Sequence, residues 1–207
     1  MNFGFLLFTD MEELDLVGPW EMVSIWSKFF SGPQHCLMIA ETDTPVTCFN
    51  GMVITPHRSF QNAPQLDYLL IPGGIGTRAG MNNKALNDFV AKQAQTCKVV
   101  LSVCTGSFIL HSAGLLGGIK ATTHFSMLDK LRGLEGVDVV EKRFVTDGKI
   151  WSSAGVSAGM DMALELIARE AGEETAGQVQ LYAEYYPAGK IYETSHKAPN
   201  APGYIRL

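Results

Sequence analysis

A single cysteine, Cys104, stands between an apolar run and a stretch of small residues. The run Val99–Val103 is apolar at four of its five positions, and Thr105-Gly106-Ser107 follows the cysteine directly. The apolar run predicts a buried strand, and the residues after Cys104 predict a helix that extends to Gly114. In an open α/β sheet, ligands bind just beyond the carboxyl ends of the strands. Cys104 is therefore predicted to lie where a cysteine can act as a nucleophile.

The position of Cys104 between strand and helix predicts a nucleophile elbow. A helix that begins within a residue or two would favour the thiolate over the thiol, through its free N–H groups and its dipole. Gly106 supplies the close packing that such a turn requires, whereas Ser102 stands where a hydrolase elbow carries its first glycine. The alternative interpretation makes Cys104 a small buried hydrophobe, as most free cysteines are. That interpretation applies to the other three cysteines, Cys36, Cys48 and Cys97.

Two glycine-rich segments match known motifs but lack the partners that those motifs need. Gly155–Gly159 reads G-x-S-x-G, yet a serine hydrolase with Ser157 as nucleophile needs a downstream acid and histidine, and the only later histidine is His196. Gly74–Ala79 fits the loose dinucleotide fingerprint without the acidic residue expected about 20 positions further on. Its small residues at a strand end would instead expose backbone N–H groups to an anion or a developing negative charge.

Three further side chains could donate or accept a proton. Asp15 has apolar neighbours, which predict a partly buried carboxyl with a raised pKa, although it could also stabilise a turn at Gly18-Pro19. Glu21 falls on the helix face away from the apolar residues and is expected to be solvated. His124 has a pKa suited to a base, but a histidine among small residues at a strand end is more often structural.

Aromatic and small residues near these segments are candidates for an apolar substrate pocket. The aromatic candidates could equally belong to the core, and we favour the core for Trp26. The candidate pocket residues are Gly18, Trp20, His124, Phe125 and Val156.

Apolar runs that alternate with helical patterns supply the framework for these residues. Apolar runs predict strands at 3–8, 36–40, 68–72, 99–103, 137–145 and 149–152, with a hairpin at 46–55. Helical spacing predicts helices at 20–30, with Pro19 at the first helical position, and at 83–95, 105–114, 158–169 and 174–185. Together they indicate a mainly parallel sheet covered on both faces. One α/β domain over residues 1–207 fits best, with an irregular tail from Pro187.

Composition and charge narrow the classes of protein. The chain is 46 % hydrophobic and 18 % charged, which is ordinary for a globular domain. A net charge of −5 argues against a nucleic-acid partner, which would need a broad basic patch. Phe5–Phe8 is too short for a signal peptide, and Val99–Ile119, though long enough for a membrane span, is rich in glycine and polar residues. Without a Cys-x-x-Cys pair, reduced cysteines in a cytoplasmic protein are expected.

Six segments extend over essentially the whole chain in a specific order: LDLVGPWE, IPGG, SVCTGSFILHSAGLL, ATTHF, GVSAGMD and VQLYAEYYP. In this order they resemble the ThiJ/PfpI superfamily of class I glutamine-amidotransferase-like domains, which includes the DJ-1-like proteins, and within it the isonitrile hydratase branch. The resemblance implies a flavodoxin-like three-layer sandwich, a homodimer, a small-molecule substrate, and neither a metal nor a cofactor.

The resemblance also implies roles for particular residues. It places the catalytic cysteine at Cys104, the acid at Asp15 and an auxiliary threonine at Thr105. The amides of Gly73 and Gly74 are expected to face the thiol, and Gly155–Gly159 is expected to start a helix beside the active site.

Two departures from the superfamily pattern affect these expectations. Val17 stands where a threonine is common, which leaves the polarity of the pocket open. The chain ends soon after Pro202, without the longer helical tail of some relatives, which leaves the edge of the dimer open.

The implied reaction is the hydration of an isonitrile to an N-substituted formamide, through a thioimidate on Cys104 with Asp15 as general acid and base. Glyoxalase or deglycase activity and intracellular peptidase or amidase activity are alternatives. Thr105 stands where the peptidase branch has a histidine, and Asp15 where the glyoxalase branch has a glutamate. A non-catalytic redox or ligand sensor is the third alternative, and a DNA-binding version would need a separate partner.

Overall fold

The computed structural model describes residues 1–187, 195–199 and 201–205 of the chain. Its centre is a seven-stranded sheet in the order β10-β11-β7-β6-β1-β2-β5. All neighbouring strands in this sheet are parallel except β10 and β11, which pair antiparallel at one edge. The strands are β1 (Asn2–Leu6), β2 (His35–Ala40), β5 (Arg58–Ser59), β6 (Tyr68–Ile71), β7 (Val99–Val103), β10 (Phe144–Asp147) and β11 (Ile150–Ser153).

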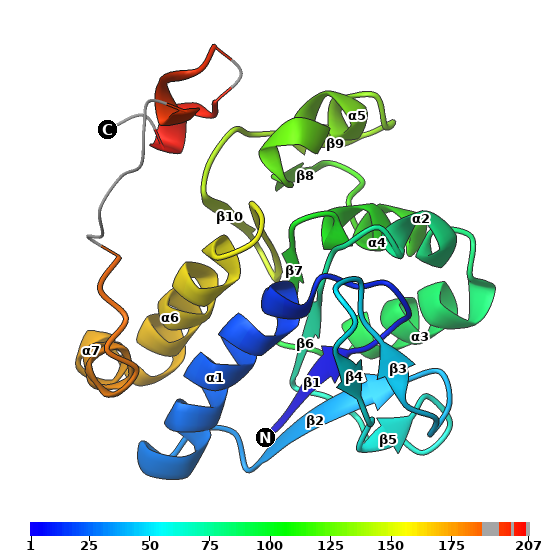
Figure 1. Cartoon of the computed structure of the whole chain (residues 1–207). Coiled ribbons are helices and arrows are strands. Elements are labelled where there is room, and N and C mark those ends of the chain that lie inside the picture. Colours follow the sequence, from blue (N-terminus) through cyan, green and yellow to red (C-terminus); the bar gives the residue numbers. More distant parts are fainter. Residues whose placement is uncertain (188–194, 200, 206–207) are drawn as a thin grey trace.

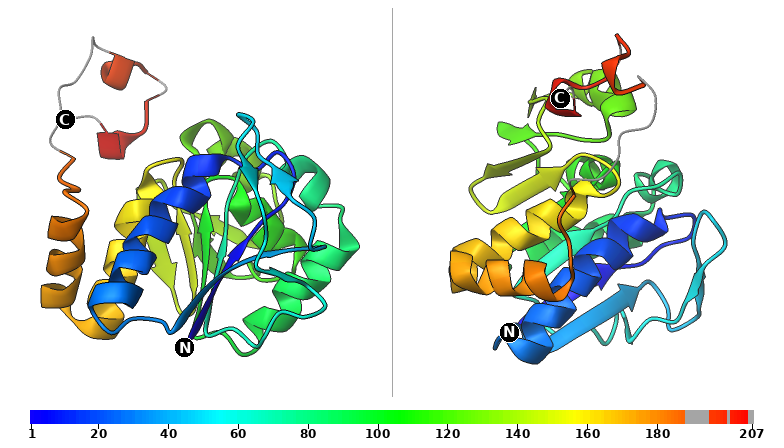
Figure 2. Two further views of the ribbon diagram at one scale, coloured as in Figure 1. Left: turned by 60° about the horizontal axis from the view of Figure 1, so that its bottom comes forward. Right: turned by 60° about the vertical axis from the view of Figure 1, so that its left-hand side comes forward.

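Helices cover both faces of the sheet, as Figure 1 and the left view of Figure 2 show. α1 (Glu13–Phe29), α6 (Ala158–Ala171) and α7 (Glu173–Tyr182) cover one face, and α3 (Lys84–Ala94) and α4 (Gly106–Ser112) cover the other. The short α2 (Thr77–Gly80) packs against α4. The predicted α/β fold with a mainly parallel sheet is confirmed, and its layers and strand order are those of a flavodoxin-like sandwich.

Alternate residues of the central strands point into two separate cores. In β1, Phe3 and Phe5 contact the core under α1 and α6, whereas Leu6 belongs to the core under α3 and α4. In β6, Leu70 belongs to the core under α1 and α6, and Leu69 belongs to the core under α3 and α4. Successive side chains of a strand point to opposite faces, and both faces here are covered. This double burial explains why these strands appear in the sequence as continuous apolar runs.

Smaller elements lie outside the main sheet. β3 (Val46–Thr47) and β4 (Val53–Ile54) form the predicted hairpin. β8 (Ile119–Ala121) pairs with β9 (Val137–Val139) beside α5 (Leu128–Arg132). The single strand predicted at 137–145 is wrong, because the polar segment 141–143 separates β9 from β10 and the two belong to different sheets.

The tail predicted to be irregular from Pro187 is described only in part. The described portion holds two short 3-10 turns, Ser195–Lys197 and Gly203–Ile205. The prediction for 188–194, 200 and 206–207 lies outside the described residues. Within the described ranges, no helix has the length and apolar character to cross a membrane, and the stretch from Val99 instead forms β7 and α4.

The start of α1 differs from the prediction. Pro19 is predicted at the first helical position, but α1 begins at Glu13 and Pro19 lies inside it. Proline has no N–H to donate to the carbonyl of Asp15, so one helical hydrogen bond is missing there. Pro19 packs closely on α6, where a Cβ on Gly159 would lie 2.9 Å from the proline Cγ. The earlier start places Asp15 in the first turn of α1, where it is buried.

The chain changes direction across the sheet between β1 and β6. After β1 it passes through α1 on one face to β2, and after β6 it passes through α3 on the opposite face to β7. Ligands of open α/β sheets bind at the carboxyl ends of the strands beside such a switch point. The segments after β1, β6 and β7 carry Asp15, Gly73 and Cys104 respectively.

Candidate active site

Cys104 forms a strained turn between β7 and α4. Its φ of +56° lies in the left-handed region, which residues with a side chain rarely adopt. Two residues after Cys104 the turn requires a glycine, because a Cβ on Gly106 would lie 2.4 Å from the carbonyl oxygen of Ile71. The turn therefore has the geometry of a nucleophile elbow.

Hydrogen bonds to the backbone of Cys104 fix the elbow in place. The Cys104 N–H donates to the carbonyl of Ser153 at the end of β11 (3.1 Å). The Cys104 carbonyl accepts from the hydroxyls of Thr123 (2.9 Å) and Ser107 (3.3 Å). The strained residue is thus held from three segments, so the direction of its side chain is preorganised.

The Asp15 carboxyl is buried beside the elbow. Its Oδ2 accepts a hydrogen bond from the N–H of Gly73 (2.9 Å), and its Oδ1 has no hydrogen-bond partner in the described part of the chain. Burial raises the pKa of Asp15 to about 8, although the Gly73 hydrogen bond opposes this shift. Asp15 is therefore a neutral carboxylic acid at neutral pH and can donate a proton.

The Cys104 thiol is also more basic than an ordinary cysteine. The residue is only 7 % exposed, and this burial raises the pKa of the thiol, with a further contribution from Asp15. The backbone N–H of Thr105 acts in the opposite direction and favours the thiolate. The sequence-based expectation of a thiolate is wrong for the resting site, because burial outweighs the seven-residue helix α4. The thiol and the carboxyl form a coupled pair.

The loop after β6 joins the carboxyl to the elbow. The N–H of Gly74 donates to the hydroxyl oxygen of Thr105 (2.9 Å), and that hydroxyl donates back to the carbonyl of Gly74 (3.1 Å). The N–H of Gly73 is bound to Asp15, and a Cβ on Gly73 would lie 2.5 Å from the Thr105 nitrogen. Both amides expected to face the thiol are therefore engaged, and they position Asp15 and Thr105.

The elbow opens into a cavity of about 280 Å³, here called the Cys104 cavity. Its wall includes four of the residues that the sequence marks as candidates for the site: Cys104, Thr105, His124 and Val156. Gly155 borders the sulfur, since a Cβ there would lie 2.9 Å from Sγ. The cavity residues that sequence reasoning did not select are Glu12, Ile75, Thr77, Arg78, Met81, Phe108, Ser126, Met127 and Lys130.

His124 contacts the site without a partner that would make it a base. Its Nδ1 lies 2.8 Å from the Ser126 hydroxyl, and burial lowers the pKa of the imidazole. The ring is therefore neutral at neutral pH. Its Cδ2 lies 2.5 Å from the Cβ that Gly155 lacks, so it packs against the segment beside Cys104.

Three candidate pocket residues lie elsewhere. Trp20 packs against Phe5 at 5.0 Å between ring centroids, so it belongs to the wall of the core rather than to the cavity. Gly18 faces α6, where a Cβ would lie 2.9 Å from the Met160 side chain. Phe125 packs against His124 with its ring tilted, and it lines a different depression with Glu141 and Pro202. As expected, Trp26 is buried in the core and Glu21 is exposed.

Ser157 of the G-x-S-x-G segment has no catalytic partner. Its hydroxyl accepts a hydrogen bond from Arg143 (3.2 Å), which also pairs with Asp161. Neither histidine nor thiol takes part in this cluster. Across the described ranges, no group of histidine, cysteine and acidic side chains could hold a metal ion.

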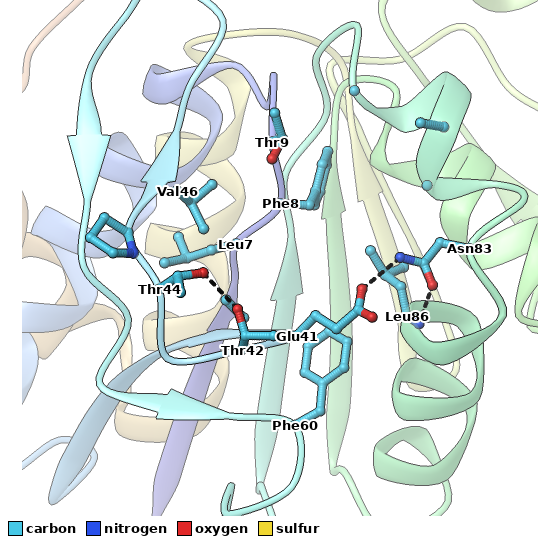
Figure 3. A pocket seen from close by; sticks show the side chains of 15 residues that line it. Leu7, Phe8, Thr9, Glu41, Thr42, Thr44, Val46, Phe60, Asn83 and Leu86 are labelled. Atoms are coloured by element: carbon cyan, nitrogen blue, oxygen red, sulfur yellow. Dashed lines mark hydrogen bonds between the residues drawn. The ribbon is translucent and has the colours of Figure 1, made fainter.

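The structure has a second cavity of about 300 Å³, here called the Glu41 cavity. Figure 3 shows it between the end of β1, the segment after β2 and the start of α3, with Leu7, Phe8 and Phe60 in its wall. The Glu41 carboxylate accepts a hydrogen bond from the side-chain amide of Asn83 (2.8 Å), as the dashed line in Figure 3 marks. Cys104 and Asp15 are not among its lining residues.

The chain is similar to a known protein family and to proteins of known sequence. The family model described as the DJ-1/PfpI family matches residues 2–169. The isonitrile hydratase of Pseudomonas putida is 39 % identical over 189 residues, which make up 91 % of this chain and 80 % of that protein. The HTH-type transcriptional regulator GbdR of Pseudomonas aeruginosa is 33 % identical over 183 residues, which make up 86 % of this chain but 49 % of the regulator.

Solved structures show the same fold. A ThiJ/PfpI family protein from Pseudomonas syringae superposes with a TM-score of 0.85 at 35 % identity, covering 99 % of this chain and 82 % of that one. DJ-1beta of Drosophila melanogaster superposes with a TM-score of 0.77 at 20 % identity, covering 88 % of this chain and 97 % of that one. The second likeness concerns the fold alone.

Proposed function

Because the chain belongs to the DJ-1/PfpI family, we propose that it is a cysteine-dependent hydro-lyase that adds water to an isonitrile and releases an N-substituted formamide. The observation that carries this proposal is the coupled pair formed by the strained Cys104, which lies in the wall of the Cys104 cavity, and the neutral Asp15, which is buried beside it. A nucleophile beside a proton donor is what addition across a carbon–nitrogen multiple bond requires.

The reaction starts when the pair loses one of its two protons. The remaining proton is shared, and the reactive form has the thiolate on Cys104 and the carboxylic acid on Asp15. The sulfur bonds to the terminal carbon of the isonitrile, and Asp15 donates its proton to the same carbon. The product of this step is a thioimidate, with a carboxylate on Asp15.

Water completes the reaction. The Asp15 carboxylate takes one proton from a water molecule, whose oxygen bonds to the thioimidate carbon. The carbon–sulfur bond then breaks, the electron pair returns to sulfur, and the hydroxyl proton moves to nitrogen. The formamide leaves, and the pair is again a thiolate beside a carboxylic acid. The backbone N–H of Thr105 favours the thiolate in both steps, in which the sulfur is first the nucleophile and then the leaving group.

The proposal predicts that the wild-type protein converts cyclohexyl isocyanide to N-cyclohexylformamide. We expect kcat/KM to rise with pH through an apparent pKa near 8, because the doubly protonated pair that predominates below this pH is unreactive. Formamide production followed by chromatography from about pH 6 to about pH 9 measures both expectations. Absence of formamide at every pH would reject the activity, and a flat profile would reject the shared proton.

A sensor is the second candidate function, and the match to GbdR is the observation that favours it. A sensor would bind or be oxidised at Cys104 without turnover. Conversion of the isocyanide over many turnovers per protein molecule separates the two candidates.

We also propose that two copies associate in the cytoplasm. The β3–β4 hairpin carries exposed apolar side chains at Phe49, Met52 and Val53, the last of them 61 % exposed. Exposed apolar side chains gathered on one element are typical of an interface. Light scattering is expected to give twice the chain mass of 22.6 kDa, and the charged variant Val53→Glu is expected to give a monomer. A single-chain mass for the wild type at micromolar concentration would contradict the dimer.

A further inference from the structure

The walls of the Cys104 cavity carry more positive than negative charge. Arg78 on α2 and Lys130 on α5 both line it, and among the described residues Glu12 is the only carboxylate that does. The local balance is therefore +1, although the whole chain has a net charge of −5. A site for a neutral isonitrile alone does not need this charge.

Neither cation is neutralised by a neighbouring acid. The three ion pairs of the described residues involve Lys84, Arg132 and Arg143 instead. The Lys130 ammonium lies 5.6 Å from the ring centroid of Phe108, a side chain that is 2 % exposed and forms part of the cavity wall. This cation–π contact holds the charge of Lys130 over the cavity.

We propose that the substrate of this site is an anionic isonitrile, in which an apolar body links the reactive carbon to a carboxylate bound by Arg78 and Lys130. This inference rests on the proposed hydratase function. The isonitrile carbon lies at Cys104, and Met81, Phe108 and Met127 of the cavity wall contact the apolar body. An arginine fork binds a carboxylate through two parallel hydrogen bonds, and a lysine adds a point charge.

The Glu41 cavity has the opposite character and serves as an internal contrast. Its volume of about 300 Å³ is similar, but Glu41 is the only charged side chain that the described part of the chain contributes to its lining. Figure 3 shows the Glu41 carboxylate bound to Asn83 at the edge of that cavity. A carboxylate ligand is repelled there, so it selects the Cys104 cavity.

The test compares 4-isocyanobenzoate with its neutral methyl ester as substrates of the wild-type protein. We expect kcat/KM to be about tenfold higher for the carboxylate, mainly through KM, which corresponds to two partly exposed charge pairs. The double variant Arg78→Gln/Lys130→Gln is expected to lose this preference, because kcat/KM for the carboxylate falls to the value for the ester. Raising NaCl from about 0.05 M to about 0.5 M should shrink the preference in the wild type only.

Two variants serve as controls, and product binding separates the inference from the proposed function. Lys92→Gln removes an exposed positive charge near the end of α3, and Glu41→Gln alters the other cavity; both should keep the preference. Calorimetry with 4-formamidobenzoate and its methyl ester measures the same preference without turnover.

Equal kcat/KM and equal binding for the acid and the ester would overturn the inference and leave the hydratase intact. Failure to convert either isonitrile would overturn the hydratase. In that case, calorimetry still tests the cationic wall. Tighter binding of 4-formamidobenzoate than of its methyl ester, lost in the double variant, would assign Arg78 and Lys130 to an anionic ligand. Equal binding of the acid and the ester would overturn that assignment too.

Discussion

Replacement of Cys104 by alanine is expected to abolish formamide formation, with kcat/KM lower by about 10⁴-fold or more. The sulfur forms the only covalent bond to the isonitrile carbon in the proposed mechanism, so no other group can replace it. The backbone that defines the elbow is held by Ser153, Thr123 and Ser107, and these contacts do not involve the thiol. The variant should therefore fold with an unchanged circular dichroism spectrum.

Two further cysteine variants make this result specific. Cys104→Ser keeps the size of the side chain, but its hydroxyl is a far weaker nucleophile, and we expect it to be as inactive as the alanine variant. Cys36→Ala removes a half-buried thiol on β2, whose pKa burial also raises, and should keep full activity. Activity above one hundredth of wild type in Cys104→Ala would remove the thioimidate from the mechanism. Loss of activity in Cys36→Ala would mean that the effect of the cysteine variants is not specific to Cys104.

Much of the fold could be predicted because its central strands are buried on both faces. Tyr68–Ile71 is a continuous apolar run and Val99–Val103 is interrupted only by Ser102, and the bounds of β7 coincide with the prediction. The same pattern predicts Cys104 at the carboxyl end of β7. Pro19 misled the prediction for α1, because a proline is usually found at a helix start and here lies inside the helix. Short elements such as α2 and β8 have too few residues to show any periodicity.

The electrostatics of the site could not be predicted from local sequence. The protonation of Cys104 depends on burial by segments distant in the chain, and this burial outweighs the helix start that favours a thiolate. Arg78 and Lys130 meet at one cavity only because α2 and α5 do, and each is an ordinary surface cation in the sequence. Gly155, in the segment after β11, borders the sulfur of Cys104. In the sequence it forms part of a G-x-S-x-G motif, which indicates Ser157 rather than Gly155 as the functional residue.

Asp15→Asn is expected to lose most activity and, at the same time, to change how stability depends on pH. An amide cannot donate the proton that forms the thioimidate carbon–hydrogen bond, so general acid–base catalysis worth about 10²–10⁴-fold is lost. The amide oxygen can still accept from the N–H of Gly73, so the fold is retained. Glu21→Gln makes the same chemical change at an exposed position of α1 and should leave activity unaltered.

The pH dependence of the wild-type free energy of unfolding should reflect the raised pKa of the Asp15 carboxyl. In the folded protein the pKa of Asp15 is raised from 3.8 to about 8, so between these values the folded state binds one proton more than the unfolded state. Wild-type stability attributable to Asp15 therefore falls as pH rises through this window, by about 4 kcal/mol between about pH 5 and about pH 8. The asparagine variant lacks this slope. The difference between its free energy of unfolding and that of the wild type should therefore shift in favour of the variant as pH rises. Urea titrations of both proteins across this range measure the difference. Parallel stability curves would mean that Asp15 is ionised in the folded protein, and the carboxyl could not then act as the proton donor to the isonitrile carbon.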